Sequence, residues 1–122
     1  MSGGDPGLAY LLDLDGEEIV YDGGIVAKFK VRAIDPTPEK AHGISYSLTL
    51  HAPDGRRLMG YDNAHGVAER GGKFAKRRVD FDHWHRDESD QGRPYRFVSA
   101  EQLIVDFFDE IERILKERQN DG

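Results

Sequence analysis

The sequence contains no cysteine. Disulfide bonds, thiolate metal sites and cysteine nucleophiles are therefore excluded, and only histidine and carboxylate side chains remain as candidate metal ligands. Long apolar runs are also missing, since no stretch approaches the ~20 residues that span a bilayer. The N-terminal segment MSGGDPG lacks the basic and apolar regions of a secretory signal. We therefore expect a protein of the cytoplasm, with no insertion into a membrane.

Three motifs of well-defined chemistry are absent as well: glycine-rich phosphate loops, serine-nucleophile elbows and Rossmann fingerprints. What is present is a chain of 122 residues, 38% hydrophobic and 33% charged, which has the size and polarity of one soluble domain. The glycine-rich start and the polar end predict loose termini at residues 1–7 and 119–122. We expect a single domain over residues 1–122, with its core at residues 8–118.

The charges are segregated along the chain, although their sum is −6. Residues 56–78, the basic segment, hold seven basic and two acidic side chains, whereas residues 1–55 hold four and nine. The basic segment could attract a polyanion locally, because fields act over roughly a Debye length of ~8 Å. An ordinary solvated loop would have the same composition. The pair Gly71-Gly72 predicts a loop or one short helix over residues 64–80.

Alternating apolar and polar residues predict several strands joined by tight turns. Residues 44–52 alternate strictly. In residues 25–34, Val26, Phe29 and Val31 point inward, with a one-residue slip after Val26. The outer face of that strand is basic and consists of Lys28, Lys30 and Arg32. Tight turns are expected at Asp15-Gly16, Asp22-Gly23-Gly24 and Asp54-Gly55. The first two turns divide residues 8–34 into short strands, and the third precedes a returning strand at residues 56–63.

The end of the chain predicts one long amphipathic helix. Ser99 and Gln102 form a capping box, with Val98 and Leu103 as the accompanying hydrophobic staple. Apolar residues at spacings of three and four then form one stripe: Leu103, Ile104, Phe107, Phe108, Ile111, Ile114 and Leu115. Because this stripe must be buried, the expected fold is α+β, an antiparallel sheet of four to six strands packed against one long C-terminal helix.

Two histidines flank the only tryptophan in the segment DFDHWHR. In an extended chain His83 and His85 point to one face, while Trp84 points to the other and would anchor the segment on the core. A metal site would need a third ligand, and no spacing selects one. Without a metal, one histidine could accept a proton from a ribose 2′-hydroxyl and the other could donate to the leaving 5′-oxygen. A surface turn is the third interpretation.

A site that cleaves RNA also needs cations to stabilise the charge that develops at phosphorus. Arg86 and Arg93 are close in sequence and complete the candidate catalytic set with His83 and His85. Candidate substrate-binding residues are aromatic, amide or basic side chains that could contact bases or phosphates: Arg56, Arg57, Tyr61, Asn63, His65, Lys76, Arg77, Arg78 and Tyr95. Ordinary turn chemistry explains the segment GYDNAHG equally well. We expect neither a metal nor a cofactor.

The order of these motifs resembles one known family. The segments DGRRLMGYDNAHG, DHWHRDESDQGRPYRF and SAEQLIVDFFDEIERIL follow one another in an arrangement similar to the TumE family, toxins of bacterial type II toxin–antitoxin pairs. The resemblance covers residues 8–118, but the interval holding VAERGGKFAKRRV and the segment DESDQG are both longer here. The positions that match the family's motifs are Gly60, Tyr61, Asp62, Asn63, His83, His85, Pro94, Tyr95 and Phe97.

The resemblance implies a growth-inhibiting endoribonuclease. Its substrate would be RNA, and its partner would be a cognate antitoxin, a DNA-binding protein encoded beside it. The alternative is a non-catalytic regulatory module that binds nucleic acid or protein through the basic segment. Such a module would bind its partner without cleaving RNA.

Overall fold

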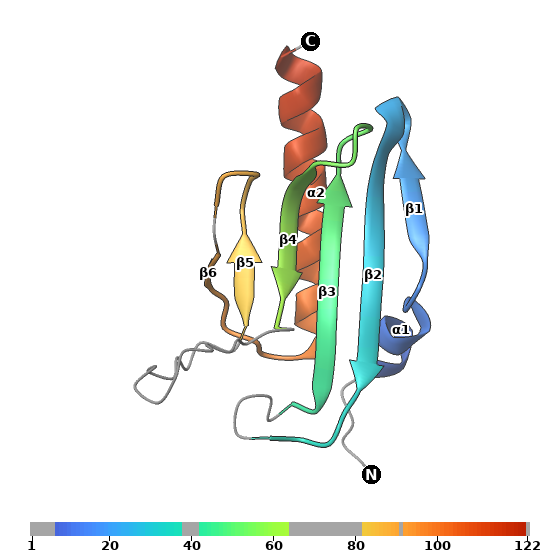
Figure 1. Ribbon diagram of the computed structural model, residues 1–122, viewed down its shortest axis with the longest axis vertical. Helices are drawn as coiled ribbons and strands as arrows, with labels where there is room; N and C mark the ends of the chain where they lie inside the picture. The colour runs from blue at the N-terminus through green and yellow to red at the C-terminus, as the bar shows by residue number, and fades with distance from the viewer. Residues whose placement is uncertain (1–6, 38–41, 64–81, 91, 122) are drawn as a thin grey trace.

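The computed structural model describes residues 7–37, 42–63, 82–90 and 92–121 (Figure 1). Six strands form one antiparallel sheet in the order β1-β2-β3-β4-β5-β6, so that each strand pairs with its neighbour in sequence. The elements are α1 (Leu8–Asp13), β1 (Glu18–Tyr21), a 3₁₀ turn (Asp22–Gly24), β2 (Ile25–Ala33), β3 (Ile44–His51), β4 (Arg57–Asp62), β5 (His83–His85), β6 (Arg93–Pro94) and α2 (Ala100–Asp121). The long helix α2 lies against one face of the sheet, which confirms the predicted α+β fold.

The sheet has a covered face, which packs against α2, and an opposite face that we call the open face. Cross-strand partners such as Phe29 and Leu48 project to the same side, so alternate residues of β2 and β3 enter the core, whereas β4 is buried continuously from Leu58 to Tyr61. The strict alternation predicted for β3 is confirmed, because every second residue from Ile44 to Leu50 is buried. In the described part of the chain, both helices lie on the covered side, where Leu11 of α1 is also buried.

The apolar stripe of α2 fills the centre of the core, as its spacing predicts. Phe107 meets Phe29 edge-on, with ring centroids 5.5 Å apart, and it meets Tyr61 in the same way at 6.2 Å. Ser99 Oγ accepts the Gln102 backbone amide at 3.0 Å, which confirms this half of the capping box. The Gln102 side chain donates forward to Asp106 instead of reaching back.

The predicted hydrophobic staple at the start of α2 is wrong. Val98 is 67% exposed, whereas Leu103 is fully buried, so the two side chains do not share one environment. The preceding residue Phe97 packs instead on His42, with ring centroids 4.0 Å apart. This aromatic contact fixes the entry of the chain into α2 and replaces the staple.

The slip predicted in β2 is also wrong. Ile25, Ala27, Phe29 and Val31 are all buried, and Val26 is half-buried on the other side, opposite His51. The strand therefore alternates regularly over its whole length. The small side chain of Ala27 is a weak hydrophobic signal in the sequence, although it is completely enclosed beneath the helices.

The first segment, expected as a strand, is the short helix α1. Short apolar runs such as LAYLLD are compatible with either element, and leucine and alanine have high helix propensity. Leu11 donates its amide to the Gly7 carbonyl and is buried in the core. A Cβ on Gly7 would lie 2.6 Å from the Glu101 Cα, so only glycine permits this close packing of α1 on α2. No helix in the described residues has the length and apolar character needed to cross a membrane.

Candidate functional site

Two rows of side chains cross the open face of the sheet, and we call them the transverse rows. Cross-strand register defines them, because partners on neighbouring strands project to the same side. The first row consists of Lys28, Thr49, Gly60 and His85, and the second of Lys30, Ser47, Asp62 and His83. Each row begins with a lysine of β2 and ends with a histidine of β5. The prediction that both histidines share a face is therefore confirmed.

One carboxylate lies between the two histidines. Asp62 Oδ2 is 3.1 Å from His85 Nε2, and Asp62 Oδ1 is 3.9 Å from His83 Nδ1. All three side chains are partly buried, and His83 is the most exposed of them at 27%. Sequence reasoning included Asp62 only as part of a family motif, because the register that brings β4 beside β5 is not visible in residue spacing. We call these three residues the His–Asp–His centre.

His85 is held on three sides. Its Nδ1 lies 3.1 Å from the Asp90 carbonyl oxygen, and its Nε2 faces Asp62. A carbonyl and an ionised carboxylate both accept, so His85 satisfies both only when each ring nitrogen carries a proton. Gly92 passes over the ring, where a Cβ would lie 2.9 Å from His85 Cε1. The glycine thus leaves space that any other residue would remove.

The loop behind His85 is organised by the Asp90 carboxylate. It accepts the backbone amides of Arg86 at 3.0 Å and Gly92 at 2.9 Å, and it pairs with the Arg93 guanidinium at 2.7 Å. These donors, the Arg86 amide foremost, lower the pKa of Asp90 to about 2. Because the Asp90 carbonyl also accepts from His85, the folding of this loop positions the imidazole.

A second histidine–aspartate pair lies where the core approaches the start of β5. His42 Nε2 donates to Asp82 Oδ2 at 3.2 Å, and its Nδ1 accepts the Ile44 amide at 3.4 Å. The Tyr46 hydroxyl donates to the same Asp82 oxygen at 2.7 Å. Burial and the Asp82 charge raise the pKa of Tyr46 far above its usual range. With one donor and one acceptor around it, His42 fits a neutral ring.

Several predicted contact residues lie in the core and not on the open face. Tyr61 is 3% exposed and stacks on Trp84 at 5.9 Å, which confirms Trp84 as a core anchor. Asn63 is fully buried, accepts the Tyr46 amide and donates to the Ile44 carbonyl. Its contacts join the ends of β3 and β4, which is a structural use of the polar amide.

Tyr95 and Arg93 also lie on the covered side. The Tyr95 hydroxyl donates to Asp106 Oδ2 at 2.5 Å, and burial together with this carboxylate raises the pKa of Tyr95 well above its usual range. Arg93 is partnered with Trp84 across β5 and β6, and its guanidinium lies 5.1 Å from the Trp84 ring. The structure does not bring these residues to the histidines, and their proposed roles in RNA binding or catalysis stay predictions.

The remaining predicted residues fall into three groups. Arg56 is exposed and paired with Asp54 and Glu88. The side chain of Arg57 lies beside Gly60, which belongs to the first transverse row, since a Cβ on this glycine would be 3.5 Å from Arg57 Cδ. The Arg86 guanidinium has no ion pair within the described residues. Predicted residues outside the described part of the chain are His65, Lys76, Arg77 and Arg78.

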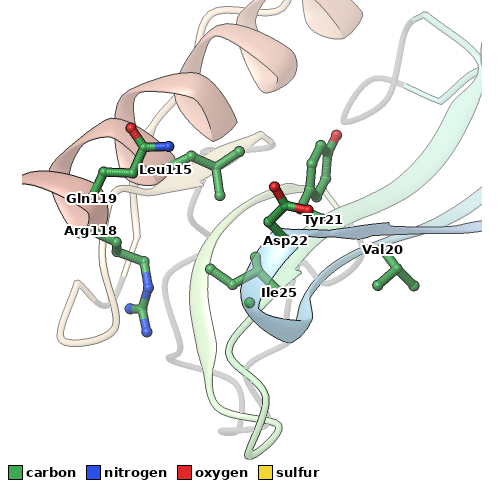
Figure 2. A pocket seen from close by; sticks show the side chains of 8 residues that line it. Val20, Tyr21, Asp22, Ile25, Leu115, Arg118 and Gln119 are labelled. Carbon is green, nitrogen blue, oxygen red and sulfur yellow. The ribbon is translucent and has the colours of Figure 1, made fainter. Parts of the chain in front are cut away.

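The opposite edge of the sheet carries a surface cleft of about 550 Å³ (Figure 2). Figure 2 shows Leu115 and Arg118 of α2 on one side of this cleft and Tyr21 and Asp22 on the other. No residue predicted for the site lines it. Within the described residues, no group of three or more histidines and carboxylates is arranged to hold a metal ion.

Comparison with known proteins identifies a family. A family profile described as Toxin TumE matches residues 12–115, a span that includes the whole His–Asp–His centre. No curated protein and no solved structure matches the chain. The matched span covers most of the sequence. The chain therefore belongs to the TumE family of toxins.

Proposed function

We propose that this toxin is an endoribonuclease that cleaves RNA at the His–Asp–His centre without a metal ion. The observation that carries the proposal is the placement of His83 and His85 side by side on the open face, with Asp62 between them. Two imidazoles beside one carboxylate can act as an acid–base pair when their hydrogen-bond partners differ, because one ring can accept a proton while the other donates one. The family of the chain supports the toxin part of the proposal.

The two histidines have different environments, and these suggest different roles. His83 turns Nδ1 toward Asp62, and within the described residues its Nε2 makes no hydrogen bond, so His83 is suited to accept the proton of the ribose 2′-hydroxyl. His85 is held with both nitrogens facing acceptors, so it is suited to hold a proton on each of them, and as general acid it would release its Nε2–H from Asp62 to the leaving oxygen. Asp62 orients both rings.

The proposed reaction balances without a further reactant. The 2′-oxygen attacks phosphorus as its proton passes to His83, and the bond from phosphorus to the 5′-oxygen breaks as His85 donates its proton. The products are a 2′,3′-cyclic phosphate and a 5′-hydroxyl end. The positive charge of a protonated His85 would stabilise the negative charge that develops in the transition state. The catalytic role predicted for Arg86 stays a prediction.

The test compares substitutions of three histidines that lie on the open face of the sheet. We expect His83→Gln and His85→Gln to lower the rate of cleavage of a short RNA by 10²-fold or more, the usual contribution of a general acid or base. His51→Gln is the matched control, because His51 bonds only to Thr49 and Gly55 within the described residues. Its cleavage rate should match the unmodified protein.

The chemistry of the product ends supplies a second, independent readout. We expect cyclic phosphate ends, unchanged cleavage in excess chelator, and no cleavage of the corresponding DNA, which lacks the 2′-hydroxyl. Tight RNA binding with no cleavage by any variant would instead favour the non-catalytic binding module. Loss of cleavage on chelation would favour a metal-dependent hydrolase.

The proposed partner is a cognate antitoxin that binds DNA and is encoded beside the toxin. Expression of the toxin alone should arrest growth and degrade RNA, and co-expression of the adjacent gene should restore both. His85→Gln expressed alone should permit growth. Growth arrest by this variant would separate toxicity from the His–Asp–His centre.

A further inference from the structure

Three cations project from β2 on the open face. Lys28, Lys30 and Arg32 are exposed, and within the described residues none of them forms an ion pair. Three other arginines of the described chain are neutralised locally, since Arg56, Arg93 and Arg113 each have a carboxylate partner at 3.1 Å or less. Glu18 is the residue in register with Lys28 on β1. The cations of β2 are thus an unneutralised group on a chain of net charge −6.

The transverse rows connect these cations to the histidines. Between Lys28 and His85 lie only Thr49 and Gly60, and between Lys30 and His83 lie only Ser47 and Asp62. Thr49, Gly60 and Ser47 are small, and the Ser47 hydroxyl can donate to a phosphate or ribose oxygen, whereas the Thr49 hydroxyl is hydrogen-bonded to His51 at 2.9 Å. The rows therefore form a polar path across the strands, with a positive end at β2 and the His–Asp–His centre at β5.

The length of this path corresponds to a few nucleotides. Strands β2 and β5 are separated by three strand spacings, which amount to ~14 Å at ~4.8 Å each. A stacked nucleic acid strand advances ~3.4 Å per nucleotide, so the path equals about four stacked nucleotides or about two extended ones. A strand that instead followed β2 along its length would contact all three cations but would run parallel to β5 and not reach the histidines.

We infer that single-stranded RNA crosses the strands of the sheet, and that Lys28 and Lys30 bind a phosphate two to four nucleotides from the phosphate that reacts. This inference rests on the proposed function, since the reacting phosphate is placed at the His–Asp–His centre. It adds a second subsite at a defined distance. It also explains why an acidic protein keeps an unneutralised basic strand on this face.

The first experiment measures binding without cleavage. The probe is a fluorescently labelled single-stranded DNA of 12 nucleotides, which carries the phosphates but no 2′-hydroxyl. Because each neutralised phosphate contributes ~0.7 to the salt slope of a single strand, and both lysines are placed on one phosphate, we expect Lys28→Ala/Lys30→Ala to reduce the slope of log K against log [NaCl] by about 0.7. The control Lys116→Ala/Arg118→Ala removes the same charge from α2 and should leave the slope unchanged.

The second experiment measures the distance between the subsites. A single uncharged methylphosphonate is moved along a short RNA that the protein cleaves. We expect kcat/KM to fall at one linkage two to four nucleotides from the cleaved bond, and this sensitivity should disappear in the Lys28→Ala/Lys30→Ala protein. Sensitivity confined to linkages next to the cleaved bond would overturn the inference.

The two proposals can fail separately. If the salt slope falls as expected but RNA is not cleaved, the phosphate subsite is supported and the proposed ribonuclease activity is contradicted. Cleavage with an unchanged salt slope would retain the ribonuclease and overturn the subsite. In that second case the cations of β2 would be free to bind another polyanion, such as an acidic segment of the antitoxin.

Discussion

The two histidine–aspartate pairs have the same composition and different chemistry. His42 and Asp82 lie near the core, and His85 and Asp62 lie on the open face. The Asp–His distances are nearly equal, 3.2 and 3.1 Å. The difference lies in the other ring nitrogen, which accepts a backbone amide in His42 and faces a carbonyl in His85. The partner of the second nitrogen therefore decides whether such a pair suits a neutral or a charged ring.

The largest effect is expected where the charge of Asp62 is removed. Asp62→Asn keeps the shape of the side chain but weakens its hold on the two imidazoles, so we expect kcat/KM to fall by about 10²-fold. The melting temperature should change little, because the asparagine amide oxygen can still accept a hydrogen bond from His85. Asp82→Asn is the matched variant, and its kcat/KM should stay within a few fold of the unmodified protein. Equal losses in both variants would remove the distinction between the pairs.

The reverse pattern is expected at Tyr46. Tyr46→Phe removes the hydroxyl that donates to Asp82 at 2.7 Å and leaves that buried carboxylate with one donor fewer. We expect the free energy of unfolding to fall by about 1–3 kcal/mol, as for other buried groups that lose a partner. Denaturant unfolding measures this change. The folded variant should keep its kcat/KM, and a large loss of activity would join the buried pair to the site.

Gly92 tests how closely the loop positions His85. Gly92→Ala would place a Cβ 2.9 Å from His85 Cε1 at a backbone φ of +118°. The control Gly55→Ala has a similar φ of +93° but nothing within 4 Å of its Cβ, so it carries the backbone strain alone. Both should lose about 1–2 kcal/mol of stability. Only Gly92→Ala should lower kcat/KM further, by about tenfold, because a displacement of ~1 Å is costly in a catalytic site.

The smallest effect concerns the Asp90 loop and appears only in acid. The pKa of Asp90 is lowered from 3.8 to about 2 on folding, so its contribution to stability is present above pH 3.8 and is lost as the pH falls through 2. Because solvent near the loop screens the interaction, we expect this contribution to be about 1–2 kcal/mol. The stability difference between the unmodified protein and Asp90→Asn should shrink between pH 5 and pH 2. A difference independent of pH would contradict the lowered pKa.

Periodic features were predictable from the sequence because they need only local information. The alternation in β3 and the apolar stripe of α2 follow from which residues a strand or helix must bury. The shared face of His83 and His85 follows from the same period of two. The short helix α1 and the buried Ala27 were not predictable, because a six-residue apolar run and a single methyl group carry too little signal.

Residues of the candidate site were harder to assign than the elements that carry them. Tyr61 and Asn63 were predicted to contact RNA, but the pairing of β3 with β4 directs Tyr61 into the core and makes Asn63 a bridge between backbones. Polar and aromatic residues of this kind serve a core or a surface equally well. Only the pairing with the neighbouring strand shows whether such a residue lies in the core or on the surface.

By itself, the sequence determined the α+β class, the long helix and the basic outer face of β2, since all three are patterns within one element. Tertiary structure alone decided that Asp62 lies between two histidines and that each transverse row joins a lysine to a histidine. These rows align residues far apart in the chain, such as Lys30 and His83. Strand register sets them, and a shift of one residue would send every one of these side chains to the other face.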